Sequence, residues 1–248
     1  MLQDLFSKGD WFFKFDYKSG YHHIEILPQH CQCLIFSLFF QGRLRFFWFT
    51  VLPFGLSVGP YLFTKIQRAV VKHWRSKGFR TFTYLDDGAG ADQVLNKAMK
   101  MSSVVCKDIP LSGFIANEEK RQWVPSQVGE LLGFILDLQH GIFHVPARRV
   151  EAHNKMIDTI IDKHFIVSAF PCLSGSLVSV GLALGPVVHL WTQGIYRDIC
   201  QANYWDKPFL VSLDTQSELL FWRDNFDGSG YLIWSPSPQS GCVNLLIC

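Results

Sequence analysis

The sequence lacks the features that would assign it to a disulfide-stabilised or zinc-binding class. Its 7 cysteines include no CxxC pair, and no cysteine and histidine spacing suits a structural zinc site. An odd number of cysteines is typical of free thiols in a reducing compartment. The N-terminal residues also carry charges where a signal peptide needs an apolar run. We therefore expect an intracellular protein, cytoplasmic or nuclear, that is not secreted.

A long run without charge also needs an interpretation. Residues 165–196 contain no Asp, Glu, Lys or Arg, and a transmembrane helix needs about 20 apolar residues. Prolines and glycines interrupt this run, so we expect two buried helices joined by turns and no membrane partner. A membrane-associated protein is the alternative. The interrupting residues are Pro171, Gly175, Gly181, Gly185 and Pro186.

What the sequence does contain is apolar and aromatic surface, since 48% of its residues are hydrophobic and 15% aromatic. A chain of 248 residues can bury a large core. The near-continuous apolar run Trp11–Asp16 predicts a buried strand. Residues 34–40 and 44–51 form a predicted hairpin that turns at Gln41-Gly42-Arg43. Further runs predict a helix over 60–76, a strand over 79–85, a tight turn at Asp86-Asp87-Gly88 and a helix over 92–107.

Short strands are expected at 113–116, 131–138 and 142–145, and helices from Pro146 to about residue 202. These patterns predict an α+β protein whose antiparallel sheet carries helices on one face. The Gly/Ser/Pro-rich tail reads as a linker.

Three carboxylates give the strongest chemical signal. Asp86 and Asp87 are adjacent at a predicted hairpin, where like charges repel unless a cation is present. Asp16 ends another predicted strand, and pairing of the two strands would bring all three together. Carboxylate oxygens suit hard divalent cations, and such a group suits phosphoryl transfer with two metals. Taken alone, Asp-Asp-Gly is also a common turn sequence.

Several motifs in order resemble those of reverse transcriptases over about residues 10–145. The stretch 15–21 (FDYKSGY) resembles their first Asp motif, 52–57 (LPFGLS) their LPxG loop and 84–87 (YLDD) their YxDD box. The stretch 117–120 (NEEK) resembles their later lysine motif, and 132–134 (LGF) their primer-grip hairpin. The wording DYKSGYHHI, VLPFGLSVGPYLFTK and LALGPVVHLWTQGIY is most similar to DIRS-type retrotransposons, which integrate with a tyrosine recombinase.

The resemblance implies a right-hand polymerase fold and an RNA-directed DNA polymerase. It assigns residues 1–145 to a palm with partial fingers at about 24–60, residues 146–202 to a helical thumb, and residues 203–248 to a connection toward a missing RNase H domain. It also implies a template with primer, of RNA or DNA, deoxynucleoside triphosphates, and two Mg²⁺ ions or Mn²⁺. The implied metal ligands are Asp16, the backbone carbonyl of Tyr17, Asp86 and Asp87.

The resemblance further implies a nucleotide site. Tyr21 would lie under the incoming sugar and exclude a 2′-hydroxyl. The other implied nucleotide contacts are Ser19, Gly20, Pro53, Phe54, Gly55 and Lys120. The implied primer grip is Leu132 and Gly133. From the residues alone, Tyr21 also reads as a core tyrosine, the LPFG stretch as an ordinary turn, Lys120 as a solvated lysine, and Leu132 as a strand residue.

A basic stripe supplies independent support for nucleic acid. Lys65, Arg68, Lys72 and Arg75 are spaced three, four and three residues apart, which places them on one helix face. Such a stripe can follow a phosphate backbone, although a solvated helix face has the same pattern. Few residues precede Asp16 compared with the family, so we expect a fragment. The alternative function is a non-catalytic, nucleic-acid-binding remnant of a degenerate retroelement.

Overall fold

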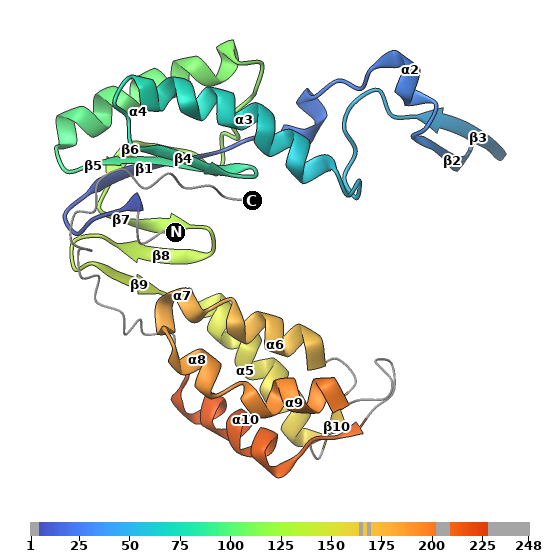
Figure 1. Cartoon of the computed structure of the whole chain (residues 1–248), viewed down its shortest axis with the longest axis vertical. Coiled ribbons are helices and arrows are strands. Elements are labelled where there is room, and N and C mark those ends of the chain that lie inside the picture. The colour runs from blue at the N-terminus through green and yellow to red at the C-terminus, as the bar shows by residue number, and fades with distance from the viewer. Residues whose placement is uncertain (1–4, 164–165, 168–169, 202–208, 228–248) are drawn as a thin grey trace. The chain divides into compact units, whose positions relative to one another are not determined.

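The structure is a computed structural model that describes residues 5–163, 166–167, 170–201 and 209–227 (Figure 1). The chain forms two compact units. The first comprises residues 1–6 and 10–127, and the second comprises residues 7–9 and 128–248. The expected class, α+β with antiparallel sheets and helices, is confirmed. The second unit includes the strands from residue 128 onward, because they pair among themselves and the turn at Gly133 accepts a hydrogen bond from Arg149 on the helix that follows.

The first unit is built on a four-stranded sheet in the order β4-β5-β1-β6. Its strands are β1 (Trp11–Asp16), β4 (Thr81–Tyr84), β5 (Asp87–Asp92) and β6 (Gln122–Ser126). Strand β1 pairs antiparallel with both β5 and β6, and β4 pairs antiparallel with β5. Strand β6 was not predicted. It lies at the edge of the sheet, where Pro125 is tolerated because one side of an edge strand needs no ladder partner.

Two helices, α3 (Gly59–Ser76) and α4 (Leu95–Leu111), cover one face of this sheet (Figure 1). Residues Phe13, Phe15 and Tyr17 point to the helices, as the alternation along a strand requires. They pack into one cluster with α3 and α4, in which Trp74 and Phe63 are fully buried. This core is what orders the strand ends where the carboxylates lie.

Two glycines of β5 leave room for the phenyl rings of Phe13 and Phe15 on β1. Gly88 is paired with Phe15, and Gly90 with Phe13. A Cβ atom on Gly88 would be 2.2 Å from Cζ of Phe15, and one on Gly90 would be 2.6 Å from Cζ of Phe13. The predicted turn at Asp86-Asp87-Gly88 was therefore wrong in register. Tyr84 pairs with Asp87, the turn is Leu85-Asp86, and Gly88 serves packing inside the strand.

A separate two-stranded hairpin, β2 (Ile35–Phe40) and β3 (Arg43–Trp48), follows the 3-10 helix η1 (Gly20–His23) and the short helix α2 (Pro28–Cys31). The hairpin is confirmed. Its turn is Gln41-Gly42, and both residues have positive φ, as tight two-residue hairpin turns require. Both strands are exposed along their whole length.

The second unit begins with a three-stranded meander of β7 (Val128–Leu131), β8 (Phe134–Asp137) and β9 (Ile142–His144). The longest helix after it is α5 (Ala147–Asp162), followed by α6 (Phe170–Val178), α7 (Gly181–Leu184), α8 (Val187–Leu190) and α9 (Gln193–Gln201). Strands β10 (Ile166–Val167) and β11 (Phe209–Leu210) pair, and α10 (Leu213–Asn225) ends the described part. Helix α10 lies within residues 203–248, which we assigned to a connection, and the Gly/Ser/Pro-rich tail beyond residue 227 is outside the described residues.

Buried polar groups join the last two long helices. The carboxylate of Glu218 on α10 accepts the backbone N–H groups of Gly194 and Ile195, at 2.7 and 3.0 Å. These groups belong to the first turn of α9 and have no partner within their own helix. Across the described residues, no helix is both long and apolar enough to span a membrane.

Candidate active site

The register between β1 and β5 places Asp16 directly opposite Asp87. Opposed residues of an antiparallel pair project to the same face of the sheet. Since Phe15 and Tyr17 face the helices, the two carboxylates lie on the other face. Lys14 and Phe12 share that face. The antiparallel pairing thus brings together two acidic residues that are far apart in the sequence.

The third carboxylate, Asp86, lies in the two-residue turn that joins β4 to β5. The preceding Leu85 has φ +49°, which is rare for a branched side chain and stores strain. Two contacts hold this turn. The amide of Gln67 on α3 donates to the carbonyl of Leu85 at 2.8 Å, and the backbone N–H of Tyr17 donates to the carbonyl of Asp86 at 2.8 Å. Both the helix and the end of β1 therefore fix the position of Asp86.

The environment of Asp86 is unusual. Its Oδ1 atom is buried and has no hydrogen-bond partner among the described residues. A Cβ atom added to Gly20 would lie 2.6 Å from this oxygen, so only a glycine lets the Gly20 backbone approach so closely. Burial raises the pKa of the Asp86 carboxyl, and the charges of Asp16 and Asp87 raise it further. A carboxylate oxygen held without a donor needs a positive charge from elsewhere.

The pKa of the Asp87 carboxyl is also raised. Burial raises the pKa of its carboxyl, and the charge of Asp16 adds to the increase, whereas Lys120 and Lys14 lower it. The charges of Asp16 and Asp87 thus act on Asp86, and the charge of Asp16 acts on Asp87, which indicates that these carboxylates lie near one another. Repulsion between neighbouring carboxylates is relieved when a cation binds beside them.

Asp16 has partners of its own. Its Oδ1 atom accepts a hydrogen bond from the amide of Asn117 at 3.1 Å, and its Oδ2 atom lies 3.4 Å from Nζ of Lys120. The backbone N–H of Asn117 also donates to the carbonyl of Asp16 at 2.7 Å. Lys120, expected from sequence to contact phosphate, thus lies beside the carboxylates with an exposed side chain.

The residues present fit an open magnesium site rather than a closed metal cage. Within the described ranges, no three His, Cys, Asp or Glu side chains lie close enough together to hold a metal ion by themselves. Magnesium commonly keeps one or two protein carboxylates and completes its shell with water and substrate phosphates. The unpartnered Oδ1 of Asp86 and the opposed Asp16 and Asp87 match that requirement.

A cluster of aromatic rings adjoins this corner. The Tyr21 ring stacks on Phe63 with centroids 4.8 Å apart and is tilted against Phe54 at 5.0 Å. Burial raises the pKa of the Tyr21 phenol, and the Asp86 charge adds to the increase, so the ring lies near that carboxylate. Tyr21 is 6% exposed and belongs to the buried cluster, which agrees with its reading as a core tyrosine.

The predicted nucleotide loop reaches Tyr21 because two distant segments pair. The backbone N–H of Leu52 donates to the carbonyl of Ile24 at 2.9 Å, and that of Ile26 donates to Thr50 at 2.8 Å. Pro53 follows as a buried residue, and Phe54 and Gly55 are exposed, with Gly55 at φ +86°. Ser19, also exposed, has φ +53°.

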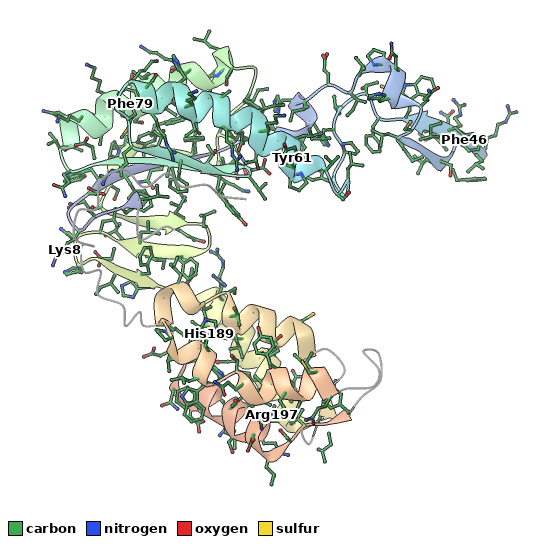
Figure 2. The ribbon with its side chains drawn as sticks, viewed as in Figure 1. Lys8, Phe46, Tyr61, Phe79, His189 and Arg197 are labelled. Carbon is green, nitrogen blue, oxygen red and sulfur yellow. The ribbon has the colours of Figure 1, made fainter. Side chains whose placement is uncertain are left out.

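The basic stripe and the predicted primer grip lie on other elements than the three carboxylates. Lys65, Arg68, Lys72 and Arg75 are exposed on α3, opposite the side that buries Phe63 and Trp74. Figure 2 labels Tyr61 in the first turn of this helix, and Lys65 lies over its ring at 5.9 Å. Leu132 and Gly133 form the turn between β7 and β8 in the second unit, with φ +50° and +76°.

Sequence reasoning missed the supporting side chain Gln67, and it gave Asn117 no contact of its own although the NEEK motif begins there. Gln67 is 1% exposed in a helix face that is otherwise apolar. A buried amide on such a face is a signal for a specific polar partner. No local signal links Asn117 to Asp16, because that contact depends on the path of the chain after α4.

The fold is that of a reverse transcriptase polymerase. It is similar to three structures of the foamy viral protease-reverse transcriptase. The structure titled as a complex with an RNA/DNA hybrid has a TM-score of 0.65 at 15% identity and is matched over 92% of this chain and 29% of its own. Two structures titled as double-stranded DNA complexes have TM-scores of 0.65 and 0.63, at 13% and 14% identity. They are matched over 90% and 86% of this chain and 37% and 41% of their own.

The family model described as reverse transcriptase (RNA-dependent DNA polymerase) matches residues 3–136. The chain therefore belongs to the reverse transcriptase family, whose members are nucleotidyltransferases. It spans between 29% and 41% of the length of the solved chains it resembles. No protein with a curated description matches the sequence.

Proposed function

We propose that this chain carries the catalytic part of an RNA-directed DNA polymerase encoded by a retrotransposon, most similar to the DIRS type. The observation that carries the proposal is the pairing of Asp16 with Asp87 beside the buried, unpartnered Oδ1 of Asp86. Carboxylates in that arrangement are unstable without a cation and suit phosphoryl transfer. The motif wording supports the element type, and it implies RNase H and recombinase domains in the same polyprotein, inside the cell.

In this proposal Asp16, Asp86 and Asp87 hold two Mg²⁺ ions, with the Tyr17 carbonyl as a further ligand. Bound there, the ions would supply charge stabilisation for phosphoryl transfer. The protein's own residues orient the reactants. Gly20 and Ser19 present backbone N–H groups toward the triphosphate, and Lys120 leaves Asp16 to neutralise the leaving phosphate oxygens.

The Tyr21 ring selects the sugar in this proposal. It stacks on the buried Phe63 and contacts Phe54, so these neighbours restrict its movement when a nucleotide enters. A 2′-hydroxyl would then meet a fixed ring edge, which favours deoxynucleotides. Helix α3 offers its exposed basic stripe to the template or primer backbone, and the Leu132-Gly133 turn contacts the primer end.

Primer extension tests the proposal. The chain should extend a DNA primer on an RNA template with deoxynucleotides and Mg²⁺ or Mn²⁺. Asp86→Asn should reduce the rate by at least about a hundredfold, since metal charge stabilisation amounts to several kcal/mol. The matched control is Asp214→Asn, an exposed carboxylate on α10, which should extend at the wild-type rate.

A chain that binds primed template but extends no primer under any divalent cation contradicts the catalytic proposal. That result, with binding that also survives Asp16→Asn, would instead support a non-catalytic nucleic-acid-binding remnant.

A further inference from the structure

The turn between β7 and β8 has a strained backbone. Leu131 pairs with Phe134 across the turn. The two residues between them, Leu132 and Gly133, have φ of +50° and +76°. Glycine adopts such a conformation freely, whereas leucine rarely does, because its Cβ atom crowds the backbone. A turn of this kind keeps one arrangement only when neighbouring elements hold it.

One side chain, Arg149 on α5, supplies such a contact. Its Nη1 atom donates a hydrogen bond to the carbonyl of Gly133 at 2.9 Å. A Cβ atom added to Gly133 would lie 3.3 Å from the same nitrogen. The guanidinium also lies over the ring of Phe134, 5.2 Å from its centroid. Arg149 therefore holds the turn both by its backbone and by the ring that follows it.

The same guanidinium also reaches the end of a second helix. Its Nη2 atom donates to Oγ of Ser179 at 2.6 Å, and that hydroxyl donates to the carbonyl of Ser176 at 2.6 Å. Ser179 directly follows α6, so the hydrogen bonds run from the turn to the end of that helix. A planar guanidinium presents its N–H groups in a fixed fork and can bond two separate acceptors at once, whereas an ammonium is a point charge.

A buried histidine fixes the backbone that carries Arg149. The ring of His153, one helical turn further along α5, is 2% exposed, and its Nδ1 atom hydrogen-bonds to the carbonyl of Arg149. In the neutral ring Nδ1 carries the proton, because a carbonyl only accepts, and Nε2 accepts the hydroxyl proton of Ser176 at 2.7 Å. Helices α5 and α6 thus pack side by side and are linked near the base of Arg149 (Figure 1).

We propose that Arg149 is a positioning residue for the primer end. It holds the Leu132-Gly133 turn in the conformation that the primer terminus contacts, and it links that turn to the joined helices α5 and α6. Arg149 acts through the carbonyl of Gly133 and not on the reacting atoms. This inference rests on the proposed function, in which the turn contacts the primer end.

Single-nucleotide extension of a pre-bound primed template tests this role. Arg149→Ala should lower the rate at saturating nucleotide about tenfold, because a slightly displaced primer end reacts poorly. A loss of folded protein would instead reduce the amount of primer extended in the first turnover and leave the rate unchanged. The slope of log affinity against log salt should match wild type, because Arg149 bonds the protein and no phosphate.

Arg148→Ala is the matched control, since it removes the same charge one residue earlier. Arg148 is 66% exposed and pairs with Glu130 on β7. Exposed pairs of this kind contribute little, so its rate should stay within about twofold of wild type.

Arg149→Lys separates the fork from the charge. It keeps the aliphatic stem and the positive charge but replaces the fork with one ammonium, so its rate should remain at least about threefold below wild type. This variant also tests the inference if Arg149→Ala does not fold.

Fluorescence of 2-aminopurine at the primer 3′ end reports the position of that end without any reaction. In complexes formed without divalent cation, wild type and Arg148→Ala should give the same fluorescence. Arg149→Ala should change it in the same direction as Leu132→Ala, because both variants disturb the same turn.

Three results would overturn the inference. Full rescue by Arg149→Lys, or a smaller salt slope in Arg149→Ala, would indicate a phosphate contact. Equal losses of rate in Arg148→Ala and Arg149→Ala would indicate an effect of charge alone. The polymerase proposal is judged separately. A chain that extends no primer yet shows the fluorescence change fails only as a polymerase, whereas a chain that extends primers equally with and without Arg149 refutes only the positioning role.

Discussion

Replacing Gly20 with alanine tests whether close packing fixes the position of Asp86. The added Cβ atom would lie 2.5 Å from Cζ of Phe63 and 2.6 Å from Oδ1 of Asp86. Carbon atoms in contact normally sit about 3.5 Å apart or more, so the new atom is about 1 Å too close. Phe63 is fully buried and stacked on Tyr21, and it cannot retreat without disturbing the core. The carboxylate of Asp86 must therefore move.

The expected magnitudes follow from these distances. Overpacking of a tight site costs about 1–3 kcal/mol of unfolding free energy. A melting temperature lower by about 2–4 °C per kcal/mol is expected for a protein of this size. A reacting group displaced by about 1 Å can lose about a hundredfold in rate. Gly20→Ala should therefore reduce primer extension far more than it reduces the folded fraction at the assay temperature.

Primer extension and thermal denaturation of the same preparation measure both effects. Gly175→Ala is the matched control, because a Cβ atom there meets nothing within 4 Å. As an alanine inside helix α6, it should keep or slightly raise the melting temperature and leave extension unchanged. If Gly20→Ala melts and extends like wild type, close packing does not position Asp86, and that reasoning is refuted.

Two further predictions concern charge and buried hydrogen bonds. Burial and the charges of Asp16 and Asp87 raise the pKa of Asp86 above 3.8, so the protonated carboxyl stabilises the folded state. This stability is fully present below pH 3.8 and is lost as the pH rises through the folded-state pKa. Without divalent cations, Asp86→Asn should therefore melt higher than wild type at pH 7 and equally at pH 3. Mg²⁺ should raise the melting temperature of the wild type only, and by more at pH 8 than at pH 5. Equal increases in the wild type and Asp86→Asn would contradict a cation site at Asp86. Glu218→Ala leaves two buried N–H groups unpaired and should lower the free energy of unfolding, measured in urea, by about 1–3 kcal/mol. The control Asp214→Ala, at an exposed carboxylate, should lower it by less than about 1 kcal/mol. Equal losses in the two variants would contradict this prediction.

Local patterns predicted most of the elements that carry the site. The apolar run before Asp16 forms β1, and Gln41-Gly42 makes the turn of the exposed hairpin. These elements follow from local preferences, since burial on both faces demands an apolar run and positive φ favours glycine. Strand β6 escaped prediction because its one apolar pair, Trp123 and Val124, is followed by Pro125. Its strand state comes from pairing with β1.

The position of the turn at Asp86 was decided by distant contacts. Asp-Gly is a strong local turn signal, yet here Asp87 and Gly88 are strand residues. The rings of Phe15 and Phe13 occupy the space that side chains at Gly88 and Gly90 would need. That fit moves the turn onto Leu85 and accepts the strain of its positive φ.

The sequence by itself determined the residue types of the site, the elements that carry them and the family to which they belong. Local pattern suffices there, because helix, strand and turn preferences act over a few residues. Only the tertiary structure decided that Asp16 lies opposite Asp87 and that Gly20 touches Asp86. A slip of one residue between β1 and β5 would turn Asp16 to the helix side, and the burial of Phe13 and Phe15 over two glycines excludes that slip.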